Sequence, residues 1–233
     1  MLTELKKKVL QANLELVKNG LVICTWGNVS GIDRDKGFIA IKPSGVAYEQ
    51  MKIKDIVIVD IEGRIVDGTL NPSSDTPTHL ALYRAFHDVM GITHTHSTCA
   101  TIFAQACCEI PCLGTTHADY FSNAVPVTRY LNQEEVESDY EANTGKIIIE
   151  RFKNIDPMEI PAVLVAGHAP FTWGSSPEKS VENSVVLEYI AKMALETIRL
   201  NPEIKPLPEY ILQKHYLRKH GKKAYYGQKG NHS

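Results

Sequence analysis

The N-terminal segment of the chain carries apolar residues at helical spacing. They fall on one face of a helix with 3.6 residues per turn, which predicts a helix over residues 2–18. The Asn19-Gly20 pair that follows is a typical C-terminal stop for a helix. The apolar positions are Leu2, Leu5, Val9, Ala12 and Leu16.

Short apolar stretches bounded by turn residues predict strands along the rest of the chain. Glu62-Gly63 is a tight turn between two of them, and the strand that begins at Gly91 is expected to be buried. The predicted strands cover residues 21–24, 28–32, 38–42, 56–61, 64–66, 91–96 and 162–165.

Further helices are interleaved with these strands. Pro77 belongs in the first turn of one helix, and Ser176-Pro177 caps and opens a long helix. The apolar triplet at residues 147–149 favours a strand locally, inside a stretch that otherwise predicts a helix. The predicted helices cover residues 77–86, 101–106, 133–153, 177–200 and 209–219. This order predicts an α/β protein with a central sheet flanked by helices, and the absence of repeats or linkers favours a single domain over residues 1–233.

The composition is that of an ordinary globular domain, with 43% hydrophobic and 22% charged residues. A formal net charge of −2 argues against general binding to nucleic acid or to a membrane surface. The sequence contains no apolar stretch long enough to span a bilayer. The N-terminus carries acid and lysine where a signal peptide needs its apolar segment, so we expect a cytoplasmic protein.

The chain has five cysteines, an odd number without the spacing of a disulfide framework. This favours free thiols in a reducing compartment. Four of them lie between residues 99 and 112, but without a C-x-x-C pair. We interpret them as small buried hydrophobic residues rather than as a zinc cluster. The five are Cys24, Cys99, Cys107, Cys108 and Cys112.

Two histidines, His94 and His96, stand two residues apart in the strand predicted over residues 91–96. Residues at this spacing in a strand point to the same face, so both imidazoles can reach one ion. His168 follows an apolar run and Gly167, where a strand opens into a turn. A single histidine in such a place is more often structural, but three neutral imidazoles with one open position are the arrangement of catalytic zinc. The three together predict a metal centre.

Asp75 has two interpretations. It is a carboxylate that can stand beside the metal as a ligand or a base. It also lies just before the helix predicted from Pro77, where Asp75 or Thr76 is a suitable N-cap. The two roles are compatible within one short loop.

Three loops rich in glycine, serine and asparagine offer amide and hydroxyl groups, at residues 25–28, 42–45 and 72–74. Such groups bind phosphate when several converge, and Lys42 adds a positive charge. Each loop alone is an ordinary turn, so this function requires the fold to bring the loops together. The sequence lacks Walker and Gly-x-Gly-x-x-Gly patterns and gives no support for nucleotide binding.

Two further segments carry titratable groups. Residues 115–120 combine hydroxyls, an imidazole and Asp119, which can transfer a proton at neutral pH if burial raises its pKa. The C-terminus, residues 215–227, is basic and aromatic. It fits either a nucleic-acid arm, which the net charge disfavours, or a tail that folds over a phosphate-bearing substrate or a neighbouring subunit. Tyr226 is a candidate general acid if a nearby cation lowers its pKa.

Seven ordered segments together make the chain resemble the L-ribulose-5-phosphate 4-epimerases of the class II aldolase/epimerase family. The resemblance covers nearly the whole chain. Its segments are Thr25-Trp26-Gly27-Asn28-Val29-Ser30, Ile41-Lys42-Pro43-Ser44-Gly45-Val46, Pro72-Ser73-Ser74-Asp75-Thr76-Pro77-Thr78-His79, His94-Thr95-His96-Ser97, Gly114-Thr115-Thr116-His117-Ala118-Asp119-Tyr120-Phe121, Gly167-His168-Ala169-Pro170-Phe171 and Lys214-His215-Tyr216-Leu217-Arg218-Lys219-His220-Gly221.

The resemblance implies a three-layer α/β/α fold with a mainly antiparallel sheet, and a homotetramer with active sites between subunits. The C-terminal tail, residues 209–233, would complete the active site. Zinc, or another divalent ion such as Mn²⁺ or Co²⁺, would bind His94, His96 and His168 beside Asp75. The implied phosphate-binding residues are Gly27, Asn28, Lys42, Ser44, Gly45, Ser73 and Ser74. The implied proton-transfer pair, from a neighbouring subunit, is Asp119 and Tyr226, supported by Thr116, His215 and Arg218.

The implied reaction interconverts L-ribulose 5-phosphate and D-xylulose 5-phosphate. Because C4 carries no acidic proton, we expect cleavage and re-formation of the C3–C4 bond rather than direct deprotonation. The related aldolases usually have Glu where this chain has Asp75, which favours the epimerase branch. An aldolase and a metal-free interaction module are the alternatives. The sequence fits an arabinose or an ascorbate route equally well, and it assigns no role to Lys229-Gly230-Asn231-His232-Ser233.

Overall fold

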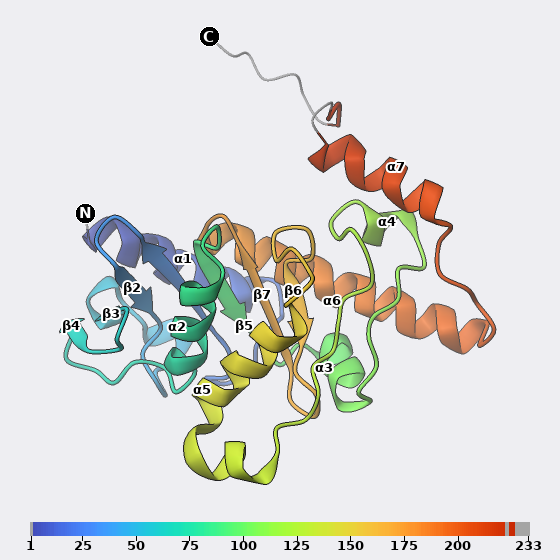
Figure 1. Cartoon of the computed structure of the whole chain (residues 1–233). Coiled ribbons are helices and arrows are strands. Elements are labelled where there is room, and N and C mark those ends of the chain that lie inside the picture. Colours follow the sequence, from blue (N-terminus) through green and yellow to red (C-terminus); the bar gives the residue numbers. More distant parts are fainter. Residues whose placement is uncertain (1, 222–223, 227–233) are drawn as a thin grey trace.

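A computed structural model describes residues 2–221 and 224–226 (Figure 1). Within this part of the chain, seven strands form one sheet in which every neighbouring pair is antiparallel, in the order β4-β3-β2-β1-β5-β7-β6. The C-terminal residues 229–233 lie outside the described residues. The strands are β1 (Asn28–Asp33), β2 (Phe38–Ile41), β3 (Val57–Asp60), β4 (Ile65–Asp67), β5 (Gly91–His94), β6 (Ala162–Leu164) and β7 (Pro170–Gly174).

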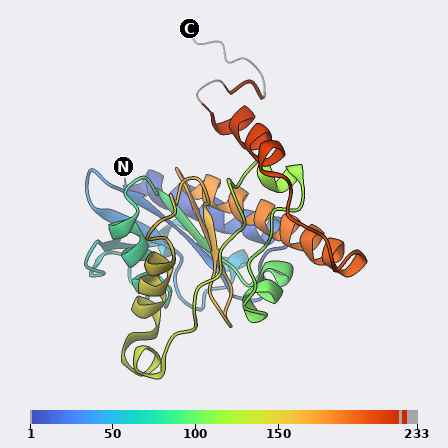
Figure 2. The same ribbon diagram turned by 45° about the vertical axis from the view of Figure 1, so that its right-hand side comes forward.

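Helices cover both faces of the sheet, which gives the three-layer α/β/α arrangement that the resemblance implied. Figures 1 and 2 show α1 and α6 along one face and α2 and α5 on the other. α3 packs against α6, and α4 packs against α7 at one end of the molecule. The helices are α1 (Leu2–Lys18), α2 (Thr76–Ala85), α3 (Thr98–Gln105), α4 (Thr115–Ala118), α5 (Gln133–Arg151), α6 (Pro177–Leu200) and α7 (Glu209–His220), with 3₁₀ turns η1 (Tyr48–Gln50) and η2 (Ile53–Asp55).

Small residues line the face of the sheet that α6 covers. A Cβ on Gly31 would come within 2.6 Å of the Pro177 ring, and one on Gly91 would overlap the backbone at the start of α6. Thr93 and Thr172 also face α6, where both hydrogen-bond Ser180. Because side chains alternate along a strand, these small residues let the helix approach the central strands closely.

Large apolar side chains occupy the opposite face of the same strands. Ile92, Phe171 and Trp173 are fully buried in the main core, against α2 and α5. The alternation also places His94 on this face, in one row with Asn28 and Phe171, its register partners on β1 and β7. At one end of the sheet, the apolar core is therefore bounded by the row of Asn28, His94 and Phe171.

Most predicted elements are confirmed, with several corrections. Residues 21–24 are not a strand: residues 21–23 have no regular structure, and a turn follows at residues 24–25, in which Cys24 has a positive φ of 53°. The triplet at residues 147–149 is helical, because two of its residues are buried in the core from one face of α5. The strand from Gly91 ends at His94, and α3 begins at Thr98 rather than at residue 101. The sequence analysis missed β7, because Pro170 suggested a continuing turn.

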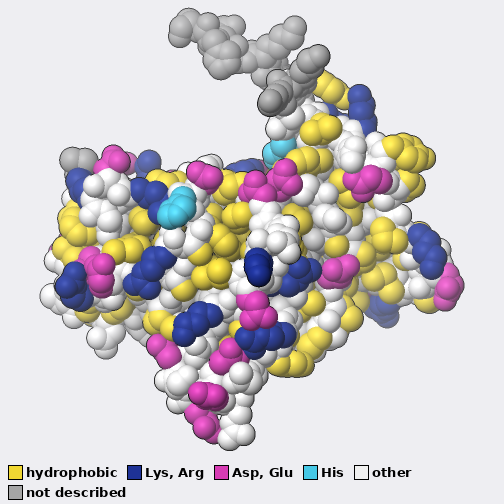
Figure 3. All heavy atoms as spheres, in the orientation of Figure 1, with side chains coloured by type: hydrophobic (Ala, Val, Ile, Leu, Met, Phe, Trp, Pro, Cys, Tyr) yellow, Lys and Arg dark blue, Asp and Glu magenta, His cyan; other side chains and the backbone are white. Residues whose placement is uncertain are grey.

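The expectations drawn from composition are confirmed for the charged side chains and only in part for the cysteines. Basic and acidic side chains are interspersed over the face in Figure 3, as the small net charge leads one to expect. All five cysteines are free, as predicted. Of the four between residues 99 and 112 that we expected to be buried, Cys112 is buried and Cys99 is half-buried, but the expectation is wrong for Cys107 and Cys108, which are exposed. Among the described residues, every helix is too short or too polar to cross a membrane.

The close contact between α6 and the sheet predicts that Gly91→Ala is destabilising. The added methyl group would overlap backbone atoms of Ser176 and Pro177, which cannot move aside as a side-chain end can. We expect the free energy of unfolding, measured by urea denaturation, to fall by about 1–3 kcal/mol. Gly114→Ala is the matched control, because its Cβ has open space. Equal stability of the two variants would contradict the close packing.

Candidate metal centre

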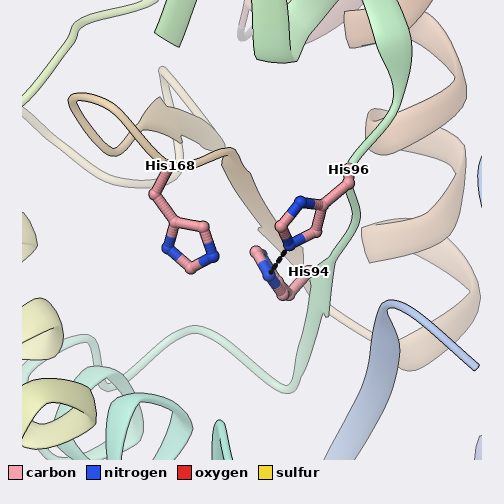
Figure 4. A group of neighbouring side chains, drawn as sticks. All are labelled: His94, His96 and His168. Atoms are coloured by element: carbon pink, nitrogen blue, oxygen red, sulfur yellow. Dashed lines mark hydrogen bonds between the residues drawn. The ribbon is translucent and has the colours of Figure 1, made fainter. Parts of the chain in front are cut away.

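Three histidines from separate positions in the chain converge at one end of the sheet (Figure 4). His94 is the last residue of β5, and His96 lies two residues further, before α3. His168 lies in the turn between β6 and β7, after Gly167, whose φ of +70° suits a tight turn. The prediction that these residues meet is confirmed, although His96 lies beyond the strand rather than in it.

The spacing of the imidazoles fits a metal ion. One ligand atom from each ring lies within 4.8 Å of the others, and the Nε2 atoms of His94 and His96 are 3.2 Å apart. Two nitrogen ligands about 2.0–2.1 Å from a tetrahedral zinc lie about 3.3 Å from each other. The residues present therefore fit a divalent cation, and the distance needs little adjustment.

A hydrogen bond and a ring contact hold His94 in place. Its Nδ1 lies 2.9 Å from the Pro170 carbonyl oxygen, which can only accept, so Nδ1 carries the proton. The lone pair of Nε2 is then available for a metal. The Phe171 ring stacks on the imidazole, with centroids 4.2 Å apart and an interplanar angle of 21°.

Partial desolvation lowers the pKa of the other two imidazoles, although His96 is exposed and His168 is only half-buried. Partial burial, together with the neighbouring His94 and His96, lowers the pKa of His168 to about 4. Burial and then His94 also lower the pKa of His96. Because a metal binds the neutral imidazole, the site is ready for an ion at neutral pH without the release of a proton.

Asp75 faces this centre rather than capping α2. It occupies the N-cap position, but its side chain makes no capping hydrogen bond, so the N-cap interpretation is wrong for the side chain. Its Oδ2 instead accepts a hydrogen bond of 2.6 Å from Asn28 Nδ2. Burial raises the pKa of Asp75, but His94, His79 and Asn28 outweigh it and hold the pKa below its usual value. Among the described residues, the compact ligand group contains the three histidines and not Asp75.

A buried polar network lies next to Asp75, which the sequence analysis did not assign. His79 Nδ1 lies 2.7 Å from Ser30 Oγ, which in turn lies 2.8 Å from the Tyr83 hydroxyl. Burial lowers the pKa of His79 to about 3, so this ring is neutral. The only sequence signal was the polar Ser30 inside an apolar strand.

The three glycine- and serine-rich loops do come together. With the histidines and Asp75 they line a cavity of about 630 Å³, which is large enough for a small phosphorylated metabolite. Tyr140 and Glu141 also line it, and the sequence analysis missed both. They follow a non-helical residue, Asp139, where α5 bends without a glycine or proline to signal it. The loop residues in the lining are Thr25, Trp26, Gly27, Asn28, Lys42, Pro43, Ser44, Gly45, Ser73 and Ser74.

Lys42 brings a buried positive charge to this cavity. The residue is only 2% exposed, and burial lowers its pKa. Its Nζ lies 3.4 Å from the carbonyl oxygens of Thr25 and Pro43 and 4.8 Å from the centroid of the Tyr48 ring. Among the described residues, no carboxylate forms an ion pair with it. An anion in the cavity would compensate this charge.

The remaining predicted site residues form a second cluster, between α4 and α7, that does not line the cavity. Asp119 accepts hydrogen bonds from Arg218 Nε at 2.9 Å and Nη2 at 2.5 Å, and its Oδ1 lies 3.1 Å from His215 Nδ1. Burial opposes ionisation, but Arg218 and His215 together lower the pKa of Asp119. The condition that burial raises the pKa of Asp119 is therefore not met, because the guanidinium of Arg218 lies beside the carboxylate, which the sequence alone did not reveal.

Tyr226 and Thr116 lie near this second cluster. Tyr226 is 60% exposed, and its ring lies 5.1 Å from the Arg218 guanidinium and 4.5 Å from Lys219 Nζ. The cation that the sequence analysis required near Tyr226 is therefore present. Thr116 lies on α4 and lines a separate cavity of about 260 Å³. Within one chain, the metal centre and this cluster are distinct.

The fold and site define a three-layer α/β protein with a cluster of three histidines, which fits a metal ion, at one end of an antiparallel sheet. The sequence profile described as "Class II Aldolase and Adducin N-terminal domain" matches residues 7–195. The chain belongs to this class II aldolase and adducin family.

Curated relatives match along almost the full length. The L-ribulose-5-phosphate 4-epimerase UlaF of Salmonella paratyphi C is 53% identical over 226 residues, which cover 97% of this chain and 99% of the relative. The protein of the same name from Salmonella typhi is 52% identical over the same shares.

Solved structures show the same fold. An L-fuculose 1-phosphate aldolase matches with a TM-score of 0.77 and 28% identity, covering 91% of this chain and 94% of its own. YgbL of Klebsiella pneumoniae, described as a putative aldolase/epimerase/decarboxylase, matches with a TM-score of 0.72 and 22% identity, covering 92% and 98%. The second likeness shows the fold alone.

The geometry predicts that His96→Ala removes the metal. Loss of one of three imidazoles leaves two nitrogen ligands, too few to hold zinc in a structural or catalytic site. We expect less than a tenth of the zinc content of the wild-type protein after dialysis, measured by elemental analysis. His87→Ala, an exposed histidine outside the site, is the control. Wild-type zinc content in His96→Ala would remove this residue from the ligand set.

Proposed function

We propose that this protein is a metal-dependent L-ribulose-5-phosphate 4-epimerase that interconverts L-ribulose 5-phosphate and D-xylulose 5-phosphate. The observation that carries the proposal is 53% identity, along 97% of the chain, to enzymes named for this activity. The chemistry of the cavity supports it, because metal ligands and phosphate-binding groups line one space.

His94, His96 and His168 would hold a divalent cation, with Zn²⁺ proposed first and Mn²⁺ or Co²⁺ as alternatives. When bound, the ion acts as a Lewis acid that stabilises negative charge on the C2 and C3 oxygens of the ketose. Asp75, ionised and hydrogen-bonded to Asn28, stands beside the centre. Its carboxylate would orient the substrate hydroxyls.

The three loops would bind the 5-phosphate of the substrate. Lys42 supplies a charge whose burial is compensated only when an anion enters. Anchoring the phosphate matters for the chemistry, because cleavage of the C3–C4 bond leaves C4 in a two-carbon aldehyde phosphate. This fragment must rotate without leaving before the bond forms again on the other face. The loop residues proposed for this role are Gly27, Asn28, Ser44, Gly45, Ser73 and Ser74.

Proton transfer at the C4 hydroxyl is the second requirement. We assign it to Asp119 and Tyr226 of a neighbouring subunit in a homotetramer, because in one chain these residues do not line the cavity. Asp119 suits a base, since Arg218 and His215 keep it ionised. Thr116, His215 and Arg218 would support the pair. Two groups that approach from different sides suit a reaction that works on both faces of an aldehyde.

An aldolase is the nearest alternative, supported by the 28% identity to an L-fuculose 1-phosphate aldolase. It would release the fragments that an epimerase retains. A metal-free interaction module is the other alternative, and the convergent histidines argue against it. A sugar phosphate substrate favours a cytoplasmic enzyme, in an arabinose or an ascorbate route.

The decisive assay incubates the zinc-loaded protein with L-ribulose 5-phosphate. We expect D-xylulose 5-phosphate, read by a coupled enzyme, with little free dihydroxyacetone. Dihydroxyacetone as the main product would favour the aldolase. A protein that binds zinc but forms neither product would contradict both enzymes.

The shared active site predicts complementation between two inactive variants. We expect Asp119→Asn to keep its zinc but to lose about 10²–10⁴-fold in turnover, because the amide cannot act as a base. Co-expression with His96→Ala should restore activity. In a ring that mixes the two variants equally and at random, about a quarter of the interfaces combine a native His96 from one subunit with a native Asp119 from its neighbour.

Hybrid oligomers are isolated through two different affinity tags, and turnover is measured with L-ribulose 5-phosphate. The control is each variant co-expressed with a second tagged copy of itself, which should stay inactive. Inactive hybrids would contradict a site shared between subunits.

A further inference from the structure

Helix α3 is in contact with both segments that carry the proposed metal ligands. It begins at Thr98, directly after the segment that holds His94 and His96. Near its other end, the carbonyl oxygen of Ala104 accepts a hydrogen bond of 2.9 Å from the Gly167 N–H, next to His168. The position of this eight-residue helix therefore affects the distance between His96 and His168.

The start of α3 is not capped by its own residues. Ser97 occupies the N-cap position, but its side chain makes no capping hydrogen bond, and its buried Oγ has no partner among the described residues. The first N–H groups of a helix need acceptors, and at this end Cys99 is half-buried and Ala100 is buried. The acceptors come instead from Glu188 of α6, whose two carboxylate oxygens accept from Cys99 N at 2.8 Å and Ala100 N at 3.0 Å.

Charge and location strengthen this contact. A carboxylate at a helix N-terminus interacts favourably with the helix dipole, and both oxygens of Glu188 are used. Burial, followed by the charge of Glu188, raises the pKa of the Cys99 thiol to about 11, so the thiol stays protonated beside the carboxylate. Glu188 belongs to the long helix that packs closely against the sheet, so it ties α3 to a rigid element.

We propose that Glu188 is a positioning residue for the metal centre, which holds α3 so that His96 and His168 are correctly spaced for the ion. This inference depends on the metal centre of the proposed function and adds a residue that touches neither metal nor substrate. Residues that hydrogen-bond a metal ligand directly typically change metal affinity by about 10–100-fold when removed, and we expect the lower end of this range for Glu188, which acts through the backbone of α3.

The test compares Glu188→Ala with Glu196→Ala. Glu196 lies on the same helix but pairs with Arg199 on the surface and makes no hydrogen bond to α3. Zinc affinity is measured by competition with a chromophoric chelator, and ligand geometry by the visible absorption of the Co²⁺-substituted protein. We expect Glu188→Ala to bind zinc at least about 10-fold more weakly, with an altered cobalt spectrum, and Glu196→Ala to match the wild type.

Glu188→Gln keeps the shape of the side chain and one carbonyl acceptor. We expect an intermediate affinity and a cobalt spectrum close to the wild type, which separates positioning from a general loss of packing. If Glu188→Ala does not fold, Glu188→Gln alone decides, by weaker zinc binding at unchanged circular dichroism.

Wild-type affinity in every folded Glu188 variant would overturn the proposal, while zinc binding by the wild type would stand. Failure of the wild-type protein to bind zinc would instead overturn the metal centre itself. The two outcomes are therefore distinguishable.

Discussion

The hydrogen bond between His94 Nδ1 and the Pro170 carbonyl organises the metal centre. It joins the end of β5 to the start of β7, next to the turn that carries His168, and it settles which nitrogen of His94 is free. Phe171 adds a flat stacking contact to the same ring. Once His94 is fixed in this way, only short segments are needed to bring in His96, which is exposed, and His168, which is half-buried. Partial desolvation lowers the pKa of both imidazoles.

Several charged groups that line the cavity have no partner of opposite charge among the described residues. Neutral imidazoles, an ionised Asp75 and a buried Lys42 without an acidic partner among the described residues line the same space. Such a set is expensive to bury on its own, because the isolated charges are poorly solvated. A cation at one end and a phosphate at the other would compensate both charges. This arrangement of charges supports the proposal that the cavity binds a cation and a phosphate.

In the second cluster, between α4 and α7, the charged carboxylate is paired within the chain. Asp119 is fully paired with Arg218 and His215, and the surrounding surface carries exposed aromatic rings next to basic groups. The cluster does not line the cavity of its own chain. In a ring of identical subunits, each interface can combine the histidine cavity of one subunit with the Asp119 cluster of its neighbour. The proposed active site is therefore complete only in the homotetramer.

The sequence alone predicted the main helices, the α/β class and the three histidines that converge in the structure. The helices and the pairing of His94 with His96 follow from local spacing, whereas His168 was added because it stands at a similar strand end. Only the tertiary structure decided that Asp75 turns away from its helix, that Arg218 lowers the pKa of Asp119, and that Tyr140 reaches the cavity. Each of these depends on groups distant in sequence, whose contacts arise when the strands pair and the helices pack, and no local pattern encodes such contacts.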